Sequence, residues 1–99
     1  MATVAKQFYR SDAPTTNQAL YTVPSATTAI VTNIVVSNTS ASSQTFSILF
    51  DGVEIAGEAE IPAKSIATFD IRQVLSATQI IAGFASSVDV KFHVSGVEV

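Results

Sequence analysis

The chain has 99 residues, a formal net charge of −3 and no cysteine. This length suits one domain with a single core, and the lack of cysteine excludes disulfides and thiolate metal sites. No basic stripe, membrane-length apolar run or signal-peptide pattern is present, so we expect no nucleic-acid partner, no membrane span and no signal peptide.

Uncharged hydroxyl side chains dominate the polar residues. Charged residues make up 13% of the chain, whereas serine and threonine together account for 23 of the 99 residues. An average globular chain carries about 25% charged residues. Because charge depletion is typical of surfaces that become interface cores, this composition favours self-association or docking on other subunits.

The N-terminal residues allow two interpretations. Residues 3–9 are either a first strand or an extended arm, and Pro14 separates them from the rest of the chain because it biases the preceding residue away from helix. Residues 18–23 then form a strand that Pro24 ends. We therefore divide the chain into an N-terminal arm or first strand over residues 1–16 and a β-sandwich domain over residues 17–99.

Residues 29–36 predict a strand that is apolar on both faces. Strict alternation places Ile30, Ile34 and Val36 on one face. The same alternation places Ala29, Val31 and Val35 on the opposite, outward face. A strand of this kind lies centrally in a sandwich or is covered by another subunit.

The next strand has a clear inward face and ends in a tight turn. In residues 45–50 the inward side chains are Phe46, Ile48 and Phe50. Asp51-Gly52 comes next, and this pair is the strongest hairpin signal in the chain because a type I′ turn requires positive φ at both central residues.

The C-terminal third predicts two or three further strands. Residues 65–71 alternate, with Phe69 inward, and residues 72–79 are the one stretch that favours a short helical turn. Residues 80–84 predict a short strand. The last strand has the most regular alternation, with Val88, Val90, Phe92 and Val94 inward. Gly96 permits a kink or bulge near its end.

These elements define the expected fold. Seven or eight short strands with turn signals every eight to twelve residues indicate an all-β, antiparallel β-sandwich, jelly-roll-like or immunoglobulin-like, with an N-terminal extended arm. Phe46, Phe50, Phe69 and Phe92 are assigned to its core.

No residue pattern indicates catalysis, a cofactor or a metal. His93 is the only histidine, and a solvated strand residue is the better interpretation, although a trimer could gather three copies on an axis. Asp51, Glu54, Glu58 and Glu60 form the densest acidic cluster, which edge protection explains better than a calcium site or a glycosidase pair. No nucleophile elbow or phosphate-binding glycine pattern occurs.

Three sequence stretches resemble a family of small tailed-phage virion proteins. They are Leu20–Thr39, Ile61-Pro-Ala-Lys-Ser65 and Val94-Ser-Gly-Val-Glu-Val99. The resemblance covers residues 20–99 and implies a non-enzymatic capsid decoration (cement) protein, or a tail, neck or fibre accessory protein. The competing classes are a carbohydrate- or cell-surface-binding module and a cryptic enzyme subunit. The first ranks second because the chain has no tryptophan and only two tyrosines for a sugar-binding platform, and the enzyme ranks third because acid, base and nucleophile candidates do not converge.

The functional expectation is a virion structural protein on the capsid surface, made in the host cytoplasm. Its expected partners are the major capsid protein or other virion proteins, and copies of itself, with a trimer preferred. Two groups of residues are expected at interfaces because arginine and aromatic residues are enriched there. The first group lies on the N-terminal segment and contains Lys6, Phe8, Tyr9 and Arg10. The second is the outward strand face of Ala29, Val31 and Val35.

Overall fold

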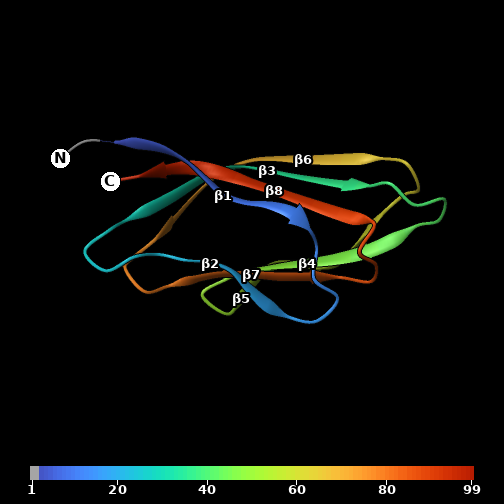
Figure 1. The fold of residues 1–99 in the computed structure, drawn as a ribbon, viewed down its shortest axis with the longest axis horizontal. Helices are drawn as coiled ribbons and strands as arrows, with labels where there is room; N and C mark the ends of the chain where they lie inside the picture. The colour runs from blue at the N-terminus through green and yellow to red at the C-terminus, as the bar shows by residue number, and fades with distance from the viewer. Residues whose placement is uncertain (1–2) are drawn as a thin grey trace.

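The computed structural model describes residues 3–99 and folds them into two facing β-sheets of four strands each (Figure 1). The part of the predicted arm at residues 1 and 2 lies outside the described residues. The strands are β1 (Val4–Asp12), β2 (Gln18–Thr22), β3 (Ala29–Asn38), β4 (Gln44–Phe50), β5 (Val53–Ile61), β6 (Ile66–Leu75), β7 (Ile80–Ala85) and β8 (Val90–Glu98). Within residues 3–99 no helix is long and apolar enough to cross a membrane.

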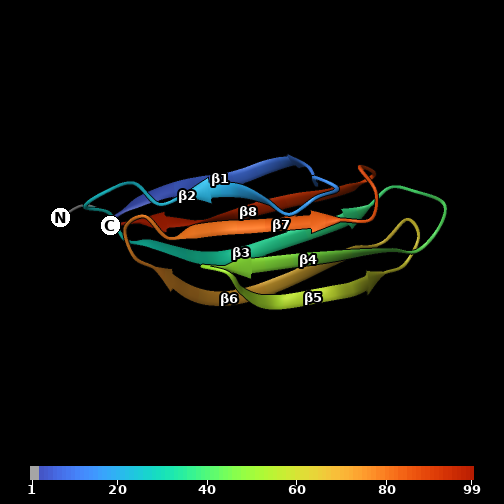
Figure 2. The same cartoon turned by 90° about the horizontal axis from the view of Figure 1, so that it is seen from below.

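The strand order identifies the type of sandwich. One sheet has the order β1-β8-β3-β6 and the other β2-β7-β4-β5, with every pair antiparallel. Seen from below, β2 lies in front of β1, β7 in front of β8, β4 in front of β3 and β5 in front of β6 (Figure 2). This arrangement is the eight-stranded jelly roll. The prediction of an all-β antiparallel sandwich is therefore confirmed, in its jelly-roll form.

The turn after β4 is confirmed, and the predicted helical turn is wrong. Asp51 and Gly52 have φ values of 52° and 80°, and Phe50 pairs with Val53 across the two-residue turn. Residues 72–75, in contrast, continue β6 as a strand that pairs with β3. Their pairing with β3 outweighs their weak helical preference.

A β-bulge in β3 reverses the predicted faces at its start. The pairing of β3 with β8 shifts between Val31 and Asn33, so Thr32 is an extra residue. Ala29 and Val31 are consequently fully buried in the core, and they are not on the outward face as predicted. Ile30 points outward instead of inward.

The core prediction for the phenylalanines is largely confirmed. Phe46, Phe50 and Phe92 are buried, and Phe69 is half-buried against them. Val88, however, lies in the turn before β8 and is 54% exposed, because the strand begins only at Val90.

The N-terminal segment is a strand of the same domain. β1 pairs with β8 over its whole length, with one register shift between Gln7 and Tyr9. That shift turns Phe8 into the core, where 5% of it is exposed. Of the two interpretations that the sequence allows, the structure has the paired strand rather than a detached arm.

One buried polar residue stabilises the loop by which the chain crosses from the first sheet to the second. Asn38, at the end of β3, is 2% exposed, and its side-chain nitrogen donates to the carbonyls of Ser42, Ile61 and Pro62. Its side-chain oxygen accepts from the backbone and the hydroxyl of Ser40. Because a buried amide must be satisfied, Asn38 fixes the loop between β3 and β4 against the end of β5.

Candidate interaction surface

The described residues do not form a metal-binding cluster. Within residues 3–99 no cluster of three histidine or carboxylate side chains lies close enough to hold a metal ion. His93 is half-buried on the outer face of its sheet, between Arg10 and Val35 in register. The acidic residues of β5, Glu54, Glu58 and Glu60, are exposed on an edge strand that two bulges interrupt.

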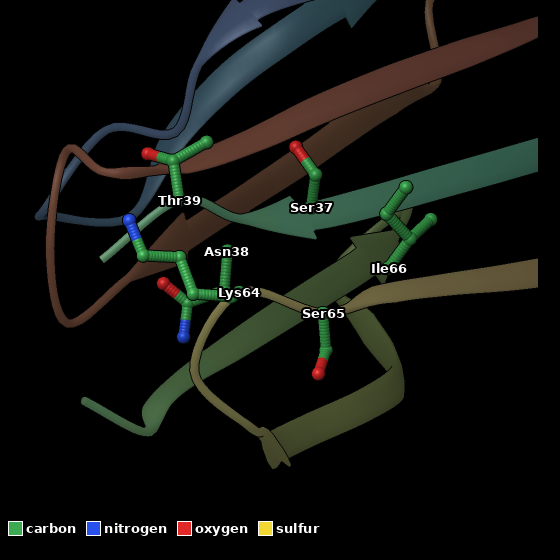
Figure 3. Close-up of a pocket in the computed structure, with 6 residues that line it drawn as sticks. All are labelled: Ser37, Asn38, Thr39, Lys64, Ser65 and Ile66. Atoms are coloured by element: carbon green, nitrogen blue, oxygen red, sulfur yellow. The ribbon is translucent and has the colours of Figure 1, made fainter. Parts of the chain in front are cut away.

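A shallow depression lies at one end of the sandwich, where β3 ends and β6 begins (Figure 3). Its lining residues are Ser37, Asn38, Thr39, Lys64, Ser65 and Ile66. It presents hydroxyl groups and one ammonium group, and no carboxylate or imidazole is among its lining residues.

The outer face of the β1-β8-β3-β6 sheet carries an uncharged band. Residues in register on neighbouring antiparallel strands project their side chains on the same face. Ala5, Val97, Ile30 and Val74 are in register and form one line across all four strands, which we call the apolar row. Val97 and Ile30 are half-buried, and Val74 is 65% exposed. The apolar row therefore crosses the sheet from edge to edge, with its two end residues, Ala5 and Val74, exposed.

The structure separates the predicted interface residues into accessible and buried groups. Phe8 belongs to the core, as Ala29 and Val31 do, and none of the three is available to a partner in this fold. Tyr9 is half-buried, and its hydroxyl donates to the carbonyl of Asp12 at 2.7 Å.

Three predicted residues remain at the surface. Lys6 and Arg10 are exposed on β1, and Val35 is half-buried on the outer face. The strict alternation of side chains along each strand did not identify Ile30, Val97 and Val74 as neighbours on one outer face. Their common line depends on the bulge in β3 and on pairing between distant strands.

Strands β1 and β2 face each other at one side of the sandwich (Figure 2), which we call the closed side because side chains from both sheets meet there. The rings of Phe8 and Tyr21 are 4.8 Å apart between centroids. The Tyr21 hydroxyl donates to the carboxylate of Glu98, whose other oxygen lies 4.0 Å from the Lys6 ammonium. These contacts join β2 of one sheet to β1 and β8 of the other.

The opposite side, formed by β5 and β6, is called the open side. An apolar cleft of about 120 Å³ lies between the sheets there, and its lining residues are Ile48, Ile55, Ala56, Phe69 and Ile71. Four exposed large apolar residues lie on these two strands, namely Val53, Ile55, Ile66 and Val74. The open side thus has both free strand edges and uncovered apolar surface.

No protein-family model matches the sequence, and no curated protein matches it at a significant level. Among solved structures, a chain of the T13 IBDV viral particle matches with a TM-score of 0.55 and 12% identity, over 98% of this chain and 30% of that chain. The likeness is one of fold, and this chain spans about a third of the length of that one.

Two structures of a pentameric capsid protein isolated from metagenomic phage sequences also match, each with a TM-score of 0.41 and 18% identity. They are matched over 96% of this chain and over 61% and 59% of their own chains. All three neighbours come from viral capsids or particles.

Proposed function

We propose that this protein is a structural component of a virion and that it acts by binding other subunits rather than by catalysis. The observation that carries the proposal is the strand order β1-β8-β3-β6 facing β2-β7-β4-β5. Jelly rolls of this type recur in viral capsid proteins, in lectins and in cupins. The residues at the surface of this chain favour the first of these classes.

The other two classes need features that the described chain does not assemble. Cupin chemistry requires a metal held by several side chains, and residues 3–99 bring no such cluster together. Sugar-binding sites usually present exposed aromatic platforms, whereas Tyr9 and Tyr21 are both half-buried and engaged in hydrogen bonds. The apolar row and the low charge of the chain suit protein interfaces instead.

In its more specific form, the proposal is a capsid decoration protein that bridges capsid subunits and assembles with copies of itself, with a trimer preferred. A protein that binds only the assembled shell stabilises that shell by mass action. The resemblance of residues 20–99 to tailed-phage virion proteins supports this role, as does the presence of a similar fold in a viral particle. A tail, neck or fibre position is the alternative within the same class.

Quantitative mass spectrometry of purified particles tests the proposal. A decoration protein is expected in a fixed ratio to the major capsid protein, because it repeats with the capsid lattice. Copy numbers far below the number of capsid subunits would place the chain in the neck, tail or fibre. Its absence from purified particles would overturn the virion role.

The binding step is tested separately by adding the purified chain to particles that lack it. The expected result is saturable binding and a higher melting temperature of the shell. Val74→Ser, which interrupts the exposed end of the apolar row, is expected to weaken binding. Val88→Ser is the matched control, since Val88 is 54% exposed in a turn away from the row.

A further inference from the structure

We propose that copies of this chain associate head to tail, with the β6 edge of one copy receiving the β1 edge of the next and extending the β1-β8-β3-β6 sheet. The inference rests on the proposed function, which includes assembly with copies of the chain, and it adds the surface by which the copies meet. The partner is a second copy of this chain. Three features of the two edges support this choice.

The first feature is the direction of the strands. β1 and β6 are the outermost strands of their sheet, so each has one row of backbone groups without a strand partner in the described chain. In an antiparallel sheet of four strands, the first and last strands run in opposite directions. A second copy in the same orientation can therefore place its β1 antiparallel to β6, which is the geometry of strand addition.

The second feature is the apolar row, which ends at both edges. Ala5 is its exposed end on β1, and Val74 is its exposed end on β6. Head-to-tail association brings Val74 of one copy next to Ala5 of the following copy. The row then continues across the junction, and Val74, which is 65% exposed in the single chain, becomes covered.

The third feature is charge. The open side carries Glu54, Glu58 and Glu60 on β5, and Asp70 and Arg72 on β6, for a formal charge of −3. The closed side carries Lys6, Arg10 and Asp12 on β1 and no charged residue on β2, for a formal charge of +1. The negatively charged open side therefore attracts the positively charged closed side of another copy. Two open sides that met about a two-fold axis would instead bring carboxylates together, and these would repel each other.

Arg10 and Asp70 provide the sharpest test. Both are exposed on the outer face of the β1-β8-β3-β6 sheet, Arg10 on the β1 edge and Asp70 on the β6 edge. They belong to neighbouring rows of residues that are in register across the strands. Sedimentation velocity of the purified full chain at micromolar concentration and low salt is expected to show an oligomer for the wild type. Arg10→Glu alone and Asp70→Arg alone are each expected to be monomeric, because like charges then meet at every junction.

An equal mixture of the two variants is expected to regain the oligomer, because each junction again pairs opposite charges. A heterologous contact of this kind forms a ring when the rotation closes and a filament when it does not. Asp89→Arg makes the same charge change as Asp70→Arg, but in the turn before β8, and it is expected to leave the oligomer intact. Circular dichroism and the thermal midpoint confirm that each variant is folded.

Several results would overturn the inference. They are a monomeric wild type, an oligomer that survives both single substitutions, and failure of the mixture to reassociate while each variant is folded. Because these measurements use the purified chain alone, they do not depend on the particle. Detection of the chain in virions together with a monomeric wild type would retain the proposed function and reject this mode of assembly.

Discussion

The two lateral sides of the sandwich are built from the same kind of strand, yet one is sealed and the other is not. On the closed side, the tilted ring pair of Phe8 and Tyr21 and the contacts of Glu98 with Tyr21 and Lys6 connect the two sheets. On the open side, β5 and β6 leave an apolar cleft and four exposed apolar side chains. The comparison indicates that side-chain contacts between the two sheets close the β1–β2 side, whereas apolar surface remains uncovered on the open side.

Gly96→Ala is expected to give the largest effect on the closed side. A Cβ atom at Gly96 would lie 1.9 Å from the carbonyl oxygen of Ile30 and 2.9 Å from the Phe8 ring. The backbone of β3 cannot yield without losing its pairing with β8, so we expect destabilisation of about 3 kcal/mol or more. Urea denaturation followed by circular dichroism measures this change.

Gly57→Ala is the matched control on the open side. There the new Cβ would meet only the flexible Glu54 side chain, at 3.2 Å, and the free energy of unfolding is expected to change by less than about 1 kcal/mol. Equal effects at the two glycines would contradict the difference between the two sides.

Phe8→Ala is the next largest change. Phe8 is 5% exposed and packs against the tilted ring of Tyr21, so truncation leaves a cavity and is expected to cost about 3 to 4 kcal/mol. Ile55→Ala on the open side removes a side chain that is 45% exposed and is expected to cost about 1 kcal/mol or less. Both values come from chemical denaturation, and a larger loss for Ile55 than for Phe8 would reverse the comparison.

The sequence predicts the strands of this fold well because most of them have one polar and one apolar face. In β4 and β8 the alternation assigns Phe46 and Phe92 to the core without further information. In β3 both faces are apolar, so the pattern does not reveal that Thr32 is an extra residue. A single bulge exchanges the faces before and after it, which is why Ala29 and Val31 are buried and Ile30 is not.

The interaction surface is less predictable for a related reason. The apolar row joins residues as distant as Ala5 and Val74, and the link between Tyr21 and Glu98 spans 77 positions. Such neighbours depend on the order of strands in the sheets and not on any local pattern. Asn38 illustrates the same limit. Its neighbours in the sequence indicate a loop, whereas the hydrogen bonds that satisfy its buried side chain go to the carbonyls of residues 61 and 62.

Tyr21→Phe is expected to have a moderate effect, because it removes only the hydroxyl that donates to Glu98. The ring keeps its contact with Phe8, so the expected loss is that of one hydrogen bond to a charged group, about 1.5 to 3 kcal/mol. Tyr9→Phe removes an exposed hydroxyl that bonds within its own strand, to Asp12, and is the control. A double substitution with Glu98→Gln should show non-additive losses if the two side chains act together.

Ala56→Val on the open side is expected to give the smallest effect, with the opposite sign. Ala56 is half-buried and lines the apolar cleft of about 120 Å³, so two added methyl groups enter empty space between the sheets. Valine also favours strand geometry, and we expect a gain of about 0.5 to 1 kcal/mol in the free energy of unfolding. Ala13→Val is the control near the closed side, where Ala13 is 1% exposed and additional volume is expected to destabilise by about 1 to 3 kcal/mol. A loss at Ala56 equal to that at Ala13 would show that the open side is as tightly packed as the closed one, and would remove the structural difference between the two sides.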